Sequence, residues 1–80
     1  MKLYLLRPID TGEDSAWSPW YDKIFGFVIR AVSVEQARHF AAREAGDEGK
    51  DVWYDSKQTI CEELTADGVP GIILVDFAAA

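Results

Sequence analysis

The segment from Ser33 to Gly46 constrains the fold most, because it combines a helix start, an amphipathic repeat and a helix stop. Ser33 followed by Gln36 is a capping-box pattern, in which side chains satisfy the first free amides of a helix. Apolar residues then recur at three- and four-residue intervals, at Val34, Ala37, Phe40, Ala41 and Ala45. Gly46 is typical of the position after a helix end. The pattern predicts a helix with one apolar face, which must pack against a sheet.

Several segments have the two-residue repeat of a strand. The segment KLYLLR carries apolar residues on both faces of that repeat, and Pro8 ends it. FVIRAVS, after Gly26, alternates in the same way. QTICEEL and GIILVDF flank TADGVP, whose Asp-Gly and Pro-Gly pairs predict the turn of a hairpin. The last strand, Ile72 to Phe77, is the most apolar and is expected to be central.

A short helix is expected after the first strand, because Ser18 is a good cap and Pro19 a good first helical residue, and it extends to Ile24. The chain of 80 residues is expected to form one domain, 1–80, with a core of modest size. We predict an α+β fold: a small antiparallel sheet of three to four strands, one long helix packed on one face, and a short helix after the first strand. The first strand pairs with the second or with the last, and the strand order stays open.

The charge balance restricts the partners. Fourteen acidic residues against eight basic ones give a formal net charge of −6. This charge repels nucleic acids and anionic membranes and attracts basic surfaces, so neither direct nucleic-acid binding nor membrane binding is expected. The single cysteine, Cys61, cannot form an internal disulfide, and the apolar run at the N-terminus is too short for a signal peptide or a membrane span. We therefore expect a cytoplasmic protein.

No group of residues is typical of catalysis, a cofactor or a metal. His39, the one histidine, lies off the apolar stripe of the helix, and Glu62 and Glu63 beside Cys61 oppose a thiolate. The loop EAGDEGKDVWYD offers oxygen donors, but its glycine and lysine interrupt the alternation that a calcium loop requires. The sequence predicts a non-enzymatic protein. Two buried carboxylates that face each other in a cleft would instead indicate a small hydrolase or a metal-dependent enzyme.

The acidic residues form clusters, which predict a binding surface. A band of carboxylates imitates a nucleic-acid backbone and fits the Lys/Arg groove of a protein that binds one. Trp53 is expected to be an apolar anchor within this surface. The predicted partner-binding residues are Asp47, Glu48, Asp51 and Asp55 after the long helix, Glu62, Glu63 and Asp67 on the hairpin, and Trp53.

The segments MKLYLLRP, PWYDKIFGFVIRA, EAGDEGKDVW and CEELTADGVPGIILVDF carry a resemblance. The chain resembles small acidic proteins of phages and prophages of the anti-CRISPR type, some of which are DNA mimics that block the DNA-binding surface of a Cascade or Cas complex. The resemblance implies an inhibitor in the cytoplasm of a bacterial host cell, with a CRISPR Cascade or Cas subunit as its basic partner and no catalytic residues. The alternative is an accessory protein–protein interaction module that uses exposed tryptophans or a sheet edge, with the acidity serving solubility.

Overall fold

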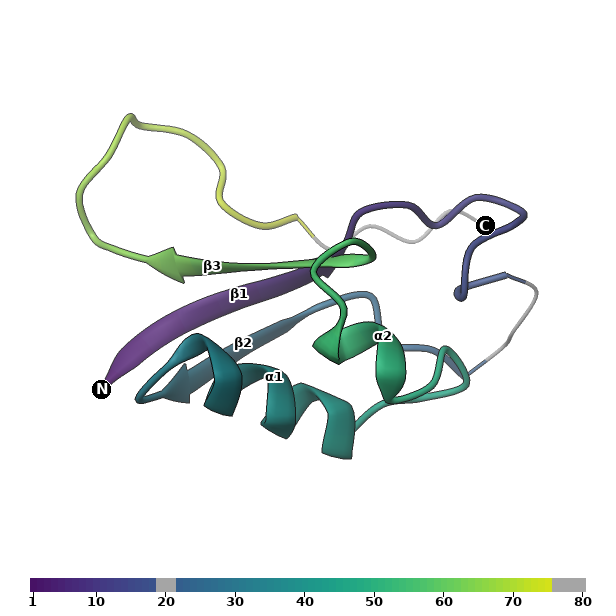
Figure 1. The fold of residues 1–80 in the computed structure, drawn as a ribbon. Helices are drawn as coiled ribbons and strands as arrows, with labels where there is room; N and C mark the ends of the chain where they lie inside the picture. The colour runs from purple at the N-terminus through teal and green to yellow at the C-terminus, as the bar shows by residue number, and fades with distance from the viewer. Residues whose placement is uncertain (19–21, 76–80) are drawn as a thin grey trace.

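The fold is α+β, with a three-stranded antiparallel sheet and two helices. A computed structural model describes residues 1–18 and 22–75 of the chain. The strands are β1 (Lys2–Pro8), β2 (Phe27–Ala31) and β3 (Thr59–Leu64), and the helices are α1 (Val34–Arg43) and α2 (Asp51–Tyr54). Both helices lie on the same side of the sheet (Figure 1). The predicted fold class is confirmed at this level.

The sheet has the order β2-β1-β3, and β1 pairs antiparallel with both neighbours. Tyr4 lies opposite Glu63 of β3, whereas Leu5 lies opposite Val28 of β2 and Glu62 of β3. Because alternate residues point to opposite faces, the row of Tyr4 faces the helices and the row of Leu5 faces away from them. We call this second side the outer face of the sheet. β1 is central because its apolar side chains serve both faces.

The core lies between the sheet and the helices. Two tryptophans fill it, with the rings of Trp17 and Trp53 edge to face at 5.6 Å between centroids, and Phe27 packs against Trp53 at 4.9 Å. The buried cluster consists of Tyr4, Leu6, Trp17, Ala31, Ala37, Ala41, Ala42, Val52 and Trp53. Alanines on α1 leave room for these large rings, so the sheet and the helices meet without large aliphatic side chains from α1.

The start of α1 has a local cause. At its start, the Ser33 hydroxyl accepts a hydrogen bond from the Gln36 amide at 3.2 Å, and the Gln36 side chain accepts one from the Val32 amide at 2.8 Å. The predicted cap is therefore confirmed. The helix ends at Arg43 after ten residues, earlier than the expected stop at Gly46, so it is shorter than the long helix that the sequence predicts.

Arg38 joins α1 to the elements that follow it. Its guanidinium donates to the Trp53 carbonyl at 2.8 Å, to the Thr59 hydroxyl at 2.8 Å and to the Thr59 carbonyl at 2.9 Å. The Thr59 hydroxyl donates in turn to the Val52 carbonyl at 2.8 Å. These bonds fix the end of α2 and the start of β3 against α1.

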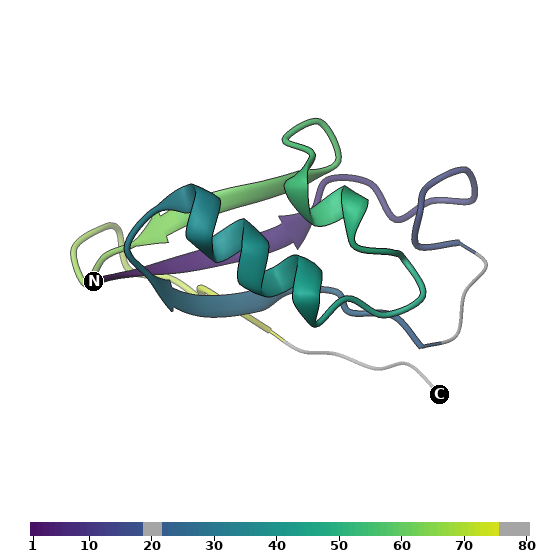
Figure 2. The ribbon, with the colours of Figure 1, turned by 60° about the horizontal axis from the view of Figure 1, so that its bottom comes forward.

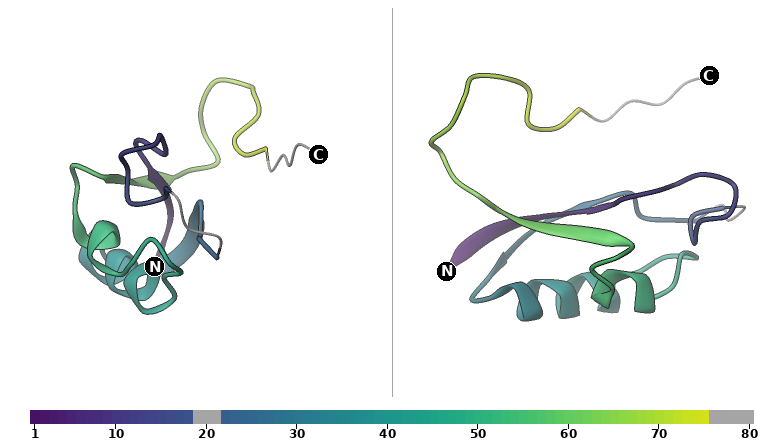
Figure 3. Two further views of the ribbon diagram at one scale, coloured as in Figure 1. Left: turned by 90° about the vertical axis from the view of Figure 1, so that its right-hand side faces the viewer. Right: turned by 45° about the horizontal axis from the view of Figure 1, so that its top comes forward.

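Two predicted elements differ from the structure. The helix expected from Ser18 to Ile24 is not helical over residues 22–24, and 19–21 lie outside the described residues. The short helix is instead α2, which follows α1. The strand expected over Ile72–Phe77 is not formed at residues 72–75, and 76–77 are outside the described part. The chain after β3 swings to the side opposite the helices instead of pairing as a hairpin (Figure 3).

The loop over residues 65–71 gives a physical reason for the missing hairpin. It is longer than the loops of about 2–5 residues that join tight hairpins. Seen from the helix side, α1 and α2 lie in front of the sheet while the segment after β3 passes behind it (Figure 2). Within the part of the chain that the structure describes, neither helix has the length or apolar content to cross a membrane.

Candidate interaction surfaces

Glu48 is an interior residue and is not part of the acidic surface. Its side chain is 5% exposed. One carboxylate oxygen accepts from the Trp53 indole N–H at 2.7 Å and the Gly46 amide at 3.0 Å, and the other accepts from the Ile24 amide at 3.0 Å. Trp53 is fully buried beside it. The prediction that Glu48 and Trp53 contact a partner is therefore corrected, because both side chains hold the core together.

The other three acids of this loop reach the surface. Asp47 and Asp51 are exposed, before α2 and in its first turn, and Asp55 is half-buried at its end. Asp55 accepts hydrogen bonds from the Gln58 side chain at 3.0 Å and the Lys57 amide at 2.8 Å. These bonds, led by the one from Gln58, hold the pKa of Asp55 below its ordinary value of 3.8. Asp55 is thus a turn-stabilising residue as well as an anion.

The second predicted acidic group lies elsewhere on the molecule. β3 begins next to α2 and runs away from it (Figure 1). Glu62 and Glu63 lie in the second half of β3, and Asp67 lies in the loop after it. Glu62 belongs to the outer face and Glu63 to the face of the helices. Glu63 pairs with Lys2 at 3.2 Å, which raises the pKa of the Lys2 ammonium. The predicted acidic residues are therefore divided between two ends and two faces.

Most of the exposed carboxylates in the described ranges form no ion pair. Among residues 1–18 and 22–75, Lys2 and Glu63 form the one ion pair within 4.0 Å. A net charge of −6 is therefore left largely uncompensated at the surface. Such a field attracts basic partners over about a Debye length, ~8 Å at physiological salt.

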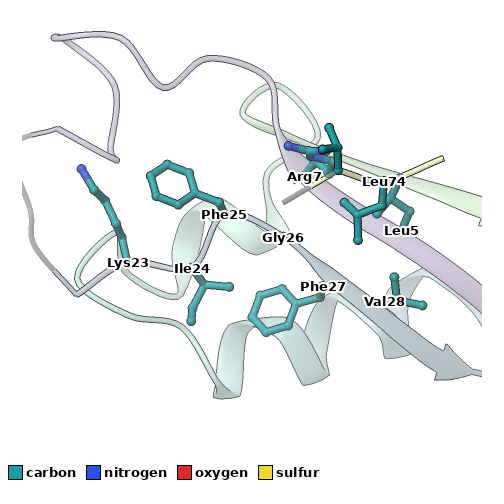
Figure 4. Close-up of a pocket in the computed structure, with 10 residues that line it drawn as sticks. Leu5, Arg7, Lys23, Ile24, Phe25, Gly26, Phe27, Val28 and Leu74 are labelled. Carbon is teal, nitrogen blue, oxygen red and sulfur yellow. The ribbon is translucent and has the colours of Figure 1, made fainter. Parts of the chain in front are cut away.

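The outer face carries a different kind of surface, a pocket of about 340 Å³ at the start of β2 (Figure 4). Leu5 and Arg7 of β1 form one side of it. The chain from Lys23 to Val28 forms a second side, and Leu74 and Val75 from the segment after β3 form the third. Three parts of the sequence that are far apart thus meet at one hollow on the uncovered side of the sheet.

The pocket is apolar with a basic rim. Lys23 donates from its ammonium to the Trp17 carbonyl at 2.5 Å and lies 5.6 Å from the ring centre of Phe25. Arg7 lies beside Gly26, where an added Cβ would be 3.7 Å from the Arg7 Cγ. The Leu6 carbonyl oxygen would lie closer, 3.2 Å from the same Cβ, so the β1 backbone is what favours glycine here. No acidic residue is among those that line the pocket in the described residues.

Large apolar side chains around the pocket remain exposed. Val28 is 53% exposed, Ile72 is 83% exposed, and Phe25, Ile73 and Leu74 are also exposed. Monomeric proteins rarely leave contiguous apolar patches beyond a few hundred Å² uncovered, and larger ones mark interaction sites.

The sequence predictions named none of these residues as a site. A usable signal was present in KLYLLR, because a strand that is apolar on both faces needs a cover on each.

The remaining reactive side chains lie apart from the pocket. His39 is exposed, and its Nδ1 lies 2.8 Å from the Tyr54 hydroxyl. Cys61 is half-buried, and burial raises the pKa of its thiol, so it stays protonated at neutral pH. In the ranges 1–18 and 22–75, no three histidine, cysteine or acidic side chains gather as metal ligands.

Comparison of this chain with known protein families, with curated proteins and with solved structures finds no match. The fold presents two candidate interaction surfaces. The first surface is the apolar pocket on the outer face. The second consists of the exposed carboxylates around α2 and along β3.

Proposed function

We propose that this chain is a non-enzymatic binding module that docks on a protein partner through the outer face of its sheet. The observation that carries the proposal is the apolar pocket with its basic rim, surrounded by exposed apolar side chains such as Val28 and Ile72. The helices α1 and α2 cover one face of the sheet. The outer face is then the one that a partner covers.

The chemistry of the pocket selects the kind of partner. Leu5, Phe25 and Val28 favour an apolar segment, and β2 is an edge strand in the order β2-β1-β3, which an extended segment can join as a further strand. Arg7 and Lys23 favour a carboxylate close to that segment. We therefore propose an extended, apolar partner segment with an acidic residue at the end that enters the pocket.

A second candidate function rests on the uncompensated carboxylates. An inhibitor of the anti-CRISPR type, in the cytoplasm of a bacterial host cell, would use them as a DNA mimic against a basic nucleic-acid-binding protein such as a Cascade or Cas subunit. Without the buried Glu48 and Trp53, its contact surface is Asp47, Asp51 and Asp55, with Glu62, Glu63 and Asp67 as a separate group. The single ion pair among the described residues favours this candidate.

Salt dependence separates the two functions. The purified chain is used to capture proteins from a bacterial lysate and purified CRISPR effector complexes, at about 0.05 M and about 0.5 M salt and with DNA as competitor. Docking through the outer face predicts a partner that survives the higher salt, ignores DNA and is lost with Val28→Asp. DNA mimicry predicts a partner that salt and DNA both release and that is lost with the double variant Asp47→Lys, Asp51→Lys.

A further inference from the structure

The two edges of the sheet differ in how well they are protected against pairing. Edge strands are commonly blunted by charged side chains, because their free amides and carbonyls otherwise accept another strand. β3 carries Glu62 and Glu63, whereas β2 has the sequence FVIRA with Arg30 as its one charge. Val28 on β2 and Val32 just after it are exposed. The edge of β2 is therefore the open one.

The chain also has an exposed apolar segment, residues 72–75, beside that edge. Residues 72–75 read IILV and are exposed, although they lie along the outer face and contribute Leu74 and Val75 to the pocket. Together with Phe25, Val28 and Val32, each at least 49% exposed, they present on the order of several hundred Å² of apolar surface. A standard stable interface buries ~800 Å² on each partner.

We propose that the partner of this surface is a second copy of the chain, in a dimer that joins the two β2 edges antiparallel and packs both 72–75 segments across the joined outer faces. This inference rests on the proposed function, since it concerns the same face, but it places the β2 strand of a second copy there in place of an acid-bearing segment of another protein. Pairing a strand with its own copy uses one patch twice, which is the isologous contact of a two-fold dimer. Each copy contributes its β2 edge and its apolar segment, residues 72–75, to the interface.

Charge supports a second copy at this edge. The chain is acidic overall, but β2 carries no acid, so two copies meet there without opposing carboxylates. With the two-fold axis at Ile29, Arg30 of each copy lies opposite Val28 of the second copy, so the two guanidinium groups do not face each other across the strands. Pairing through β3 would instead bring Glu62 and Glu63 of both copies together.

The test is sedimentation equilibrium of the full chain from about 1 μM to about 1 mM, a range that reports dissociation constants of weak and moderate dimers. The wild type is expected to change from monomer to dimer with rising concentration. Val28→Asp places a charge at the joined edge and should raise the dissociation constant at least about tenfold. Val69→Asp is the matched control, since Val69 is 90% exposed in the loop after β3 and should leave the constant unchanged. Circular dichroism checks that both variants keep the fold.

A wild-type chain that stays monomeric throughout overturns the dimer, as does a dimer that Val28→Asp leaves intact. The proposed function has its own readout, the capture of another protein. A monomer that captures a partner through Val28 overturns the dimer and keeps the proposed function. In the remaining outcome, Val28→Asp breaks the dimer and leaves the capture of other proteins unaffected. That outcome supports the dimer and overturns docking of a different protein at this face.

Discussion

Replacing Glu48 by alanine should destabilise this protein strongly, although Glu48 lies in a run of exposed acids. The carboxylate accepts three hydrogen bonds, from the Trp53 indole and from the Gly46 and Ile24 amides, and it is almost wholly buried. Glu48→Ala removes the acceptor for all three donors at once. It also opens a cavity beside Trp53, at the point where the chain after α1 meets the chain before β2.

The expected loss follows from these bonds. A buried donor left without a partner costs about 1–3 kcal/mol, and water entering the cavity satisfies part of the need, so we expect Glu48→Ala to lose about 3 kcal/mol. A chain of this length is stabilised by roughly 4–12 kcal/mol in total. Glu48→Gln keeps the shape and one good acceptor, so it should lose less, about 1–2 kcal/mol.

Urea unfolding followed by tryptophan fluorescence measures this directly, because Trp17 and Trp53 are both buried in the core. With a slope of about 1 kcal/mol per molar urea, the midpoint of Glu48→Ala should fall by about 3 M. Glu44→Ala is the control, since Glu44 is exposed at the C-terminus of α1 and should shift the free energy of unfolding by less than about 0.5 kcal/mol. Equal midpoints for the two alanine variants would refute the structural role of Glu48.

Two further predictions concern the turns that flank α2. Gly46→Ala should destabilise the fold by about 1–3 kcal/mol in urea unfolding, because the added Cβ would collide with the Asp22 carbonyl oxygen. Gly71→Ala is the control and should be near neutral, since Gly71 has open space around it. Equal effects of the two substitutions would contradict the close approach of Gly46 to Asp22. The lowered folded-state pKa of Asp55 means that its contribution to stability is present above its ordinary pKa of 3.8 and is lost as pH falls through the folded value. The stability difference between wild type and Asp55→Asn should therefore shrink when urea unfolding is repeated below that pH, and a constant difference would argue against the hydrogen-bonded carboxylate.

Local signals in the sequence predicted most of the elements that exist. The start of α1 depends on Ser33 and Gln36, which are neighbours in the chain, and the structure confirms their hydrogen bonds. The end of α1 depends on distant residues. The Gly46 amide donates to the Glu48 carboxylate, and the Asp47 amide donates to the Asp22 carbonyl at 2.6 Å. A local sequence pattern cannot predict the second contact, because Asp22 is far from Asp47 in the chain. The helix therefore ends earlier than its apolar repeat.

The segment 72–75 shows why apolar runs are ambiguous. Ile, Leu and Val favour a strand in any context, but whether a strand forms depends on a partner edge that the pattern does not identify. In the structure β3, the strand with which a hairpin would pair this segment, carries Glu62 and Glu63, and the segment lies across the outer face instead. A run of apolar residues predicts that a segment will cover an apolar surface. The strand edges that the sheet leaves free decide whether the segment does so as a strand.

The acidic cluster was harder to interpret from sequence than the fold. Asp47 and Glu48 are adjacent and chemically alike, yet one is exposed and the other is buried with all its hydrogen bonds satisfied. Trp53 is the residue that separates them, because a buried indole N–H requires an acceptor and Glu48 supplies it. The spacing of Glu48 and Trp53 in the sequence does not predict that contact, which forms only when α2 packs against the sheet.

The central claim is that the outer face, and not the acidic surface, binds the partner. The most direct test is the affinity of the captured partner for the wild type, for Val28→Asp and for the double variant Asp47→Lys, Asp51→Lys, measured at about 0.05 M and about 0.5 M salt. The account predicts that Val28→Asp weakens binding at least about tenfold, that the double variant does not, and that salt changes the wild-type affinity less than about threefold. Binding that collapses with salt and with the double variant, while Val28→Asp leaves it intact, would contradict the account and favour the DNA mimic.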